Sequence, residues 1–81
     1  MEYNRLKWAC RRGMLELDLI LMPFLENVYL NLPSDEQTLF TILLTEEDQD
    51  LFGWLMKHKE APTPQLQKIV AIILAHTGLQ P

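Results

Sequence analysis

Residues 14–31 read "MLELDLILMPFLENVYLN" and predict a long amphipathic helix. Apolar residues recur there at the i, i+3, i+4, i+7 spacing that places them on one helix face. These residues are Leu17, Ile20, Leu21, Phe24, Leu25, Val28 and Leu32. Because this face is broad, we expect the helix to be the central element of the fold. Pro23 lies inside it, cannot donate a hydrogen bond to the carbonyl of Leu19, and predicts a kink.

A shorter helix is expected on each side of the central one. Asn4 is a suitable cap for a first helix, and Gly13 is the residue type that commonly ends one. After the central helix, Pro33 ends one element, Ser34 caps the next, and Gln37 completes a capping box. The buried side of that helix is expected to hold Leu39, Phe40, Ile42, Leu43 and Leu44.

Two more helices are expected in the second half of the chain. Thr45 and Asp48 are both suitable caps for a short helix within "TEEDQDLFGWLMK". A connector containing two prolines follows, after which Thr63 caps and Pro64 begins the last helix. That helix is expected to stop at Gly78 and to bury Leu66, Ile69, Val70, Ile73 and Leu74.

The chain as a whole has the composition of a small folded domain. It has 81 residues, of which 48% are hydrophobic and 22% are charged. No segment shows the sustained alternation of apolar and polar residues that is typical of a strand. We therefore predict one all-α domain over residues 1–81, built as a compact five-helix bundle.

Charge is distributed unevenly along the sequence. The net charge is −4, yet residues 1–12 carry four basic residues against one acid, whereas the remainder carries three against ten. Nucleic-acid binding depends on many Lys and Arg contacts to phosphate, so the acidic balance argues against a nucleic-acid partner. The basic N-terminal segment can pair with the protein's own acids or with another protein.

Neither a membrane segment nor a signal peptide is expected. The longest apolar run, residues 19–25, is much shorter than a membrane-spanning helix, and the first residues, "MEYNRLKW", lack an apolar core. The single cysteine, Cys10, cannot form an internal disulfide. These features favour a cytoplasmic protein.

The residues offer little for catalysis or for tight binding of a cofactor. The chain has three glycines and no Gly-rich phosphate loop, and the acidic run "TEEDQD" lacks the spacing and central glycine of a calcium loop. Cys10 has no histidine close in sequence, since His58 and His76 come much later. We expect no enzyme activity, no metal site and no tightly bound cofactor.

The stretch "WACRRGMLELD" interrupts the helical pattern and admits two interpretations. In the first, Gly13 ends a helix, and Arg12 and Glu16, four residues apart, form a surface ion pair. In the second, Gly13 leaves room for the backbone of another protein, and Arg12 donates hydrogen bonds to it. Trp8 suits either a lid on the core or a docking face, whereas Trp54 is expected in the core.

The same stretch resembles the small bacterial flavinylation factors of succinate dehydrogenase, also called FAD assembly factors. The resemblance covers nearly the whole chain and includes "MPFLE" and "DLFGWLM"; its most specific part is Arg-Gly-x-x-Glu, here residues 12–16. It implies a helical protein that binds the flavoprotein subunit of succinate dehydrogenase, with fumarate reductase as a second candidate client. It also implies that the factor promotes covalent attachment of FAD to a histidine of that client without being the catalyst.

Residue by residue, the resemblance assigns the client contact to the interrupted stretch. Arg12 and Gly13 would be the critical contacts, Glu16 a supporting one, and Trp8 and Arg11 flanking ones. The FAD would arrive on the client, and the free factor would be a monomer. The family has also been described as the antitoxin partner of a membrane-associated toxin, which is an alternative function through protein binding.

Overall fold

The computed structural model describes residues 2–77, which form five α-helices and one short 3₁₀ helix, with no strand among them. The elements are α1 (Tyr3–Cys10), α2 (Leu15–Asn27), η1 (Tyr29–Asn31), α3 (Ser34–Leu43), α4 (Asp48–Leu55) and α5 (Pro64–Thr77). The prediction of an all-α protein with five helices is confirmed.

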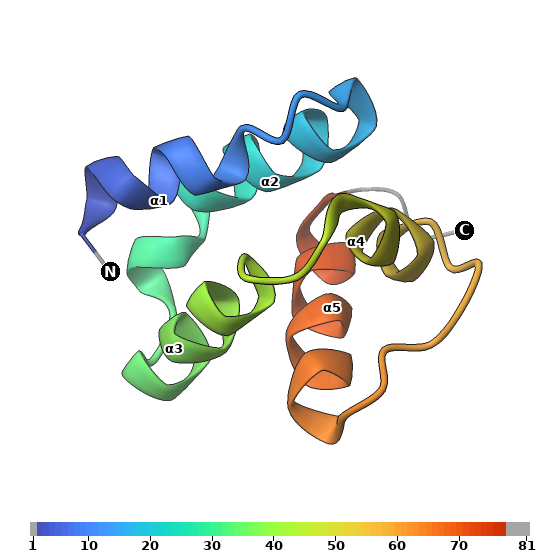
Figure 1. The fold of residues 1–81 in the computed structure, drawn as a ribbon. Coiled ribbons are helices and arrows are strands. Elements are labelled where there is room, and N and C mark those ends of the chain that lie inside the picture. The colour runs from blue at the N-terminus through green and yellow to red at the C-terminus, as the bar shows by residue number, and fades with distance from the viewer. Residues whose placement is uncertain (1, 78–81) are drawn as a thin grey trace.

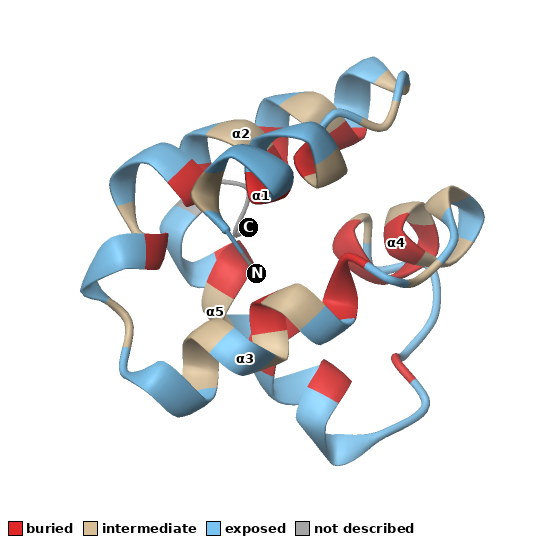
Figure 2. Ribbon diagram, turned by 60° about the vertical axis from the view of Figure 1, so that its left-hand side comes forward, coloured by how far each residue is buried: buried red, intermediate tan, exposed pale blue. Residues whose placement is uncertain are grey.

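Helix α2 lies at the centre of the packing, as its sequence predicts. It runs back along α1 after a tight turn, and it also packs against α4 and α5, while α3 packs against α5 (Figure 1). The buried segments of these helices, red in Figure 2, lie mainly on the sides that face the other helices, and the exposed segments lie mainly on the outside. A single apolar core therefore holds the helices together within a body of about 30 × 26 × 23 Å.

Most of the predicted core is confirmed. Buried side chains include Leu17, Ile20, Leu21, Phe24, Leu25, Phe40, Leu43, Leu44, Leu51, Trp54, Leu55, Leu66, Ile69, Val70, Ile73 and Leu74. Val28, Leu32 and Leu39 are partly buried. Ile42 is 44% exposed, which contradicts its expected burial. Because α3 is packed mainly against α5, Ile42 falls on its outward side.

The central helix is shorter than predicted. Helix α2 continues through Pro23 and ends at Asn27, and residues 29–31 form η1 as a separate turn. Pro23 therefore does not terminate the helix, and it is exposed on the surface of α2. The predicted stop of α5 at Gly78 lies outside the described residues.

Helix starts were predicted less well than helix faces. Thr63 accepts a hydrogen bond from the backbone N–H of Leu66 at 3.2 Å and caps α5 as predicted. No side-chain hydrogen bond caps α1, α3 or α4, whose N-cap residues are Glu2, Pro33 and Glu47. The caps predicted at Asn4, Ser34, Thr45 and Asp48 are therefore wrong.

The predicted capping box fails because Gln37 bonds elsewhere. Its side-chain amide donates to the carbonyl of Tyr29 at 2.9 Å, which ties the start of α3 to η1. Ser34 lies inside the first turn of α3 and accepts a hydrogen bond through its carbonyl from the Thr38 hydroxyl at 3.0 Å. Gln37 thus joins two elements instead of capping one.

Candidate functional site

The turn between α1 and α2 is the site where the sequence analysis placed the partner contact. Arg11 leaves the helix in an extended conformation, and its backbone N–H still donates to the Trp8 carbonyl at 3.1 Å. Gly13 has φ +80°, a left-handed conformation that glycine adopts without steric cost. The Asp18 carboxylate accepts a hydrogen bond from the Arg12 backbone N–H at 2.8 Å and holds the turn against α2.

The Arg12 side chain points inward and joins distant parts of the chain. Its Nε donates to Asp48 Oδ1 at 2.7 Å, and its two terminal nitrogens donate to the carbonyls of Ala9, Leu44 and Glu46 at 2.9, 2.9 and 2.6 Å. The side chain is 15% exposed. The guanidinium therefore ties the end of α1 to the connection between α3 and α4.

This geometry corrects the predicted Arg12–Glu16 ion pair. Arg12 pairs with Asp48, and Glu16 makes no ion pair with the described residues. Glu16 is exposed on the first turn of α2, beside an apolar hollow that Leu19 and Pro23 also line. Arg12 and Glu16 belong to one short stretch but have different surroundings.

Gly13 is exposed, and a β-carbon built on it would meet no heavy atom within 4 Å outside its neighbours. A side chain would therefore fit the space in the free protein and would project outward. The φ of +80° still disfavours any residue with a β-carbon. A substitution at Gly13 would thus place new atoms on the surface of the turn while straining the backbone modestly.

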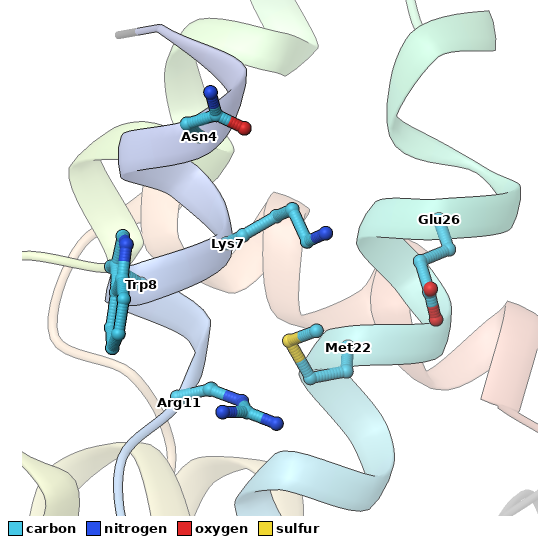
Figure 3. Close-up of a pocket in the computed structure, with 6 residues that line it drawn as sticks. All are labelled: Asn4, Lys7, Trp8, Arg11, Met22 and Glu26. Atoms are coloured by element: carbon cyan, nitrogen blue, oxygen red, sulfur yellow. The ribbon is translucent and has the colours of Figure 1, made fainter.

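Both flanking candidates, Trp8 and Arg11, border a hollow between α1 and α2 (Figure 3). This α1–α2 hollow has a volume of about 560 Å³ and is lined by Asn4, Lys7, Trp8, Arg11, Met22 and Glu26. Lys7 and Arg11 extend from the α1 side toward α2, which contributes Met22 and Glu26 (Figure 3). Trp8 is 75% exposed, so its ring is surface rather than a lid on the core.

Lys7 is a site residue that the sequence analysis did not single out. It lies four residues before Arg11, the C-cap residue of α1, and both residues line the same hollow. The i, i+4 relation to Arg11 was visible in the sequence. That Lys7 lines a hollow depends on where α2 packs, and the local sequence pattern does not reveal this.

Cys10 is buried beneath the turn and is not a candidate nucleophile. Burial raises the pKa of its thiol to about 12, with the nearby Arg12 charge opposing and the Asp18 charge reinforcing the rise. The reactive form of cysteine is the thiolate, so this thiol is inert at neutral pH. Cys10 serves as a small apolar residue of the core.

The acidic run at the start of α4 has a structural role. Asp48 pairs with Arg12, and Asp50 pairs with Lys59 at 2.8 Å. The Lys59 side chain crosses the surface of Gly53, where an added β-carbon would approach its Cε to 2.7 Å. These carboxylates therefore tie α4 to neighbouring segments.

Within residues 2–77, no three His, Cys, Asp or Glu side chains are grouped so that they could hold a metal ion. The two histidines lie instead against aromatic rings: His58 contacts Phe52 and His76 contacts Phe24, both edge to face. None of the helices described is long and apolar enough to cross a membrane.

Comparison with known proteins gives consistent matches along the chain. A family model described as flavinator of succinate dehydrogenase matches residues 4–77. The FAD assembly factor SdhE of Photobacterium profundum is 53% identical over 77 residues, covering 95% of this chain and 88% of that protein. The protein of the same name from Pseudomonas putida is 52% identical over 73 residues, which cover 90% of this chain and 87% of that protein. The one from Vibrio cholerae is 49% identical over 72 residues, which cover 89% of this chain and 84% of that protein.

Proposed function

Because the chain belongs to the flavinator of succinate dehydrogenase family, we propose that it binds the flavoprotein subunit of succinate dehydrogenase and promotes covalent attachment of FAD to that subunit. The observation that carries this proposal is the identity of about half the residues with FAD assembly factors over nearly the whole chain. Fumarate reductase is a second candidate client.

The contact surface in this proposal is centred on the turn between α1 and α2. Gly13 is exposed and lacks a side chain, so a client backbone can approach it closely. Trp8 and Arg11 flank it on one side, and Glu16 lies on the other, at the start of α2. An exposed indole and an exposed guanidinium are the side chains most often found at the energetic centres of interfaces.

Arg12 acts in this proposal mainly by fixing the shape of the turn. Its hydrogen bonds to Asp48 and to three carbonyls hold the backbone on which Gly13 and Arg11 are carried. A preformed turn lowers the entropy lost when the client binds. Direct contact with the client is left to the part of the Arg12 side chain that remains exposed.

The factor is proposed to act without catalysing the bond itself. The thiol that the chain could offer as a nucleophile, Cys10, is buried and protonated at neutral pH. The FAD is carried by the client, whose own histidine forms the bond to the flavin methyl carbon. The factor, a monomer in the cytoplasm, holds the client in the conformation that favours this reaction.

Deletion of the gene tests the proposal. The dehydrogenase flavoprotein subunit is separated on a denaturing gel and its covalent flavin fluorescence is measured. We expect the signal to fall in the deletion strain and to return when the wild-type chain is supplied. Unchanged fluorescence in the absence of the factor would overturn the proposal and would favour a different protein-binding role, such as that of an antitoxin.

A further inference from the structure

The α1–α2 hollow combines positive charge with an exposed aromatic ring. Lys7 and Arg11 both line it, and neither forms an ion pair with any described residue. Lys7 and Arg11 are two like charges that line one hollow, so they repel each other in the free protein. An anion bound between them would relieve that repulsion.

The rest of the hollow determines where such an anion can lie. Glu26 stands at the α2 side and carries the opposite charge, with Met22 between it and Arg11 (Figure 3). A ligand with negative charge spread over several groups would therefore meet Glu26 unfavourably. A single carboxylate would meet one acid of the lining, Glu26, and two bases, Lys7 and Arg11.

We infer that the α1–α2 hollow receives an acidic side chain of the client flavoprotein, held between Lys7 and Arg11. This inference rests on the proposed function, since it takes the client as the partner. The Arg11 guanidinium can bind a carboxylate through two parallel hydrogen bonds, and the Lys7 ammonium adds a third donor. Trp8, on the rim, packs against the residues that flank the acid.

Charge complementarity supports a protein carboxylate as the occupant. The remainder of the chain is strongly acidic, so the basic side chains of α1 and its turn form the region toward which an acidic client segment is drawn. Steering of this kind raises the association rate and depends on salt. Arg11, which lines the hollow, is two residues before Gly13 in the sequence. A client that contacts Gly13 would therefore reach the hollow with the neighbouring part of its surface.

Binding measurements on purified proteins test the inference. The wild type and the Lys7→Gln/Arg11→Gln double variant are titrated with the isolated flavoprotein subunit by calorimetry at two salt concentrations. We expect the double variant to bind about tenfold or more weakly and with a smaller salt dependence. Lys57→Gln is the matched control, because Lys57 is an exposed basic residue that lines a different hollow and should bind as the wild type does.

The position of the acid is tested by a charge exchange. Lys7→Glu should weaken binding, and changing one acidic residue of the client to lysine should restore it. Equal affinities of the double variant and the wild type would overturn the inference. So would a failure of every acid-to-lysine change on the client to restore binding.

Two further outcomes separate this inference from the proposed function. If the wild type does not bind the subunit at all, both fail together. If the wild type binds, Gly13→Leu abolishes binding and the double variant does not, the proposed function stands and the hollow is excluded. The last experiment titrates the wild type and the double variant with free FAD alone. If FAD binds the wild type and not the double variant, the hollow is a dinucleotide site and the inference is overturned.

Discussion

Arg12 and Asp48 are 36 residues apart in sequence, and their side chains meet at 2.7 Å between Nε and Oδ1. The contact joins the turn after α1 to the first residue of α4. Three backbone carbonyls accept hydrogen bonds from the same guanidinium. The arginine of the Arg-Gly-x-x-Glu stretch is therefore part of the fold as well as of the surface proposed to meet the client.

Replacing Arg12 should destabilise the protein measurably. Arg12→Ala removes four hydrogen bonds from a charged donor and leaves three carbonyls and the Asp48 carboxylate without this partner, so we expect the free energy of unfolding to fall by about 2–3 kcal/mol. Arg12→Lys keeps the charge but cannot replace the planar fork, and should lose about half as much. Urea unfolding followed by circular dichroism measures both.

Glu16→Gln is the matched control for this measurement. Glu16 makes no ion pair with the described residues, so its substitution should change stability by less than about 0.5 kcal/mol. A loss at Glu16 as large as the loss at Arg12 would mean that the pair expected from local spacing forms in solution.

The helices and the core were predictable because apolar periodicity directly reflects burial. In α5, Thr63 caps the helix, Pro64 begins it, and the predicted apolar residues are all buried. In this segment, local propensity and tertiary packing favour the same structure. Trp54 in the core follows from the same periodicity.

Helix starts were harder to predict because polar side chains have more than one partner available. The Gln37 amide bonds to the Tyr29 carbonyl, and the Asp48 carboxylate bonds to Arg12. Both are contacts between elements, which local sequence spacing does not reveal. The left-handed Gly13 was foreseeable from its residue type, whereas the inward direction of Arg12 was not.

Substitution of Gly13 should separate folding from function. Gly13→Leu places a β-carbon at φ +80° and should cost about 1–2 kcal/mol of stability, with no clash in the free protein. Gly13→Asn should cost less, because asparagine tolerates this conformation better. We expect both variants to fold and both to support little covalent FAD attachment, because each puts a side chain where the client approaches.

The measurement is covalent flavin fluorescence in cells that carry only the variant, alongside thermal unfolding of the purified proteins. Normal flavinylation with Gly13→Leu would remove the case for close approach at this turn. Loss of function with Leu but not with Asn would instead assign the effect to side-chain size.

The end of α4 contains a second left-handed residue, Lys57, with φ 61°. Its position follows the C-cap Met56, and the His58 backbone N–H donates to the Gly53 carbonyl at 2.8 Å, which closes the helix end. Lys57→Gly should raise the free energy of unfolding by about 0.5–1 kcal/mol, because glycine adopts this conformation without strain. Lys57→Ala keeps the β-carbon and should give no gain; an equal gain from both would show that charge, not conformation, is responsible.

Stability should fall at high pH because of Cys10. The folded-state pKa of about 12 lies above the value of 9.0 for an unperturbed thiol, so below pH 9 the thiol is protonated in both states and stability is unaffected. As pH rises from about 9 toward 12, the unfolded chain ionises first and the free energy of unfolding decreases. At pH 10.5 the loss attributable to this thiol should be about 2 kcal/mol. Urea unfolding of wild type and Cys10→Ala between pH 7 and 10.5 measures it, and parallel curves would contradict the raised pKa.

Truncation should affect stability strongly at one tryptophan and little at the other. Trp54 is 5% exposed within the core, so Trp54→Ala should lower the free energy of unfolding by about 3–5 kcal/mol. Trp8 is 75% exposed, so Trp8→Ala should change it by less than about 0.5 kcal/mol. We expect Trp8→Ala nonetheless to weaken binding of the flavoprotein subunit by at least about fivefold, since truncating an indole at an interface costs more than about 1 kcal/mol. Calorimetric titration measures the affinity, and an unchanged affinity would place Trp8 outside the contact while leaving Gly13 within it.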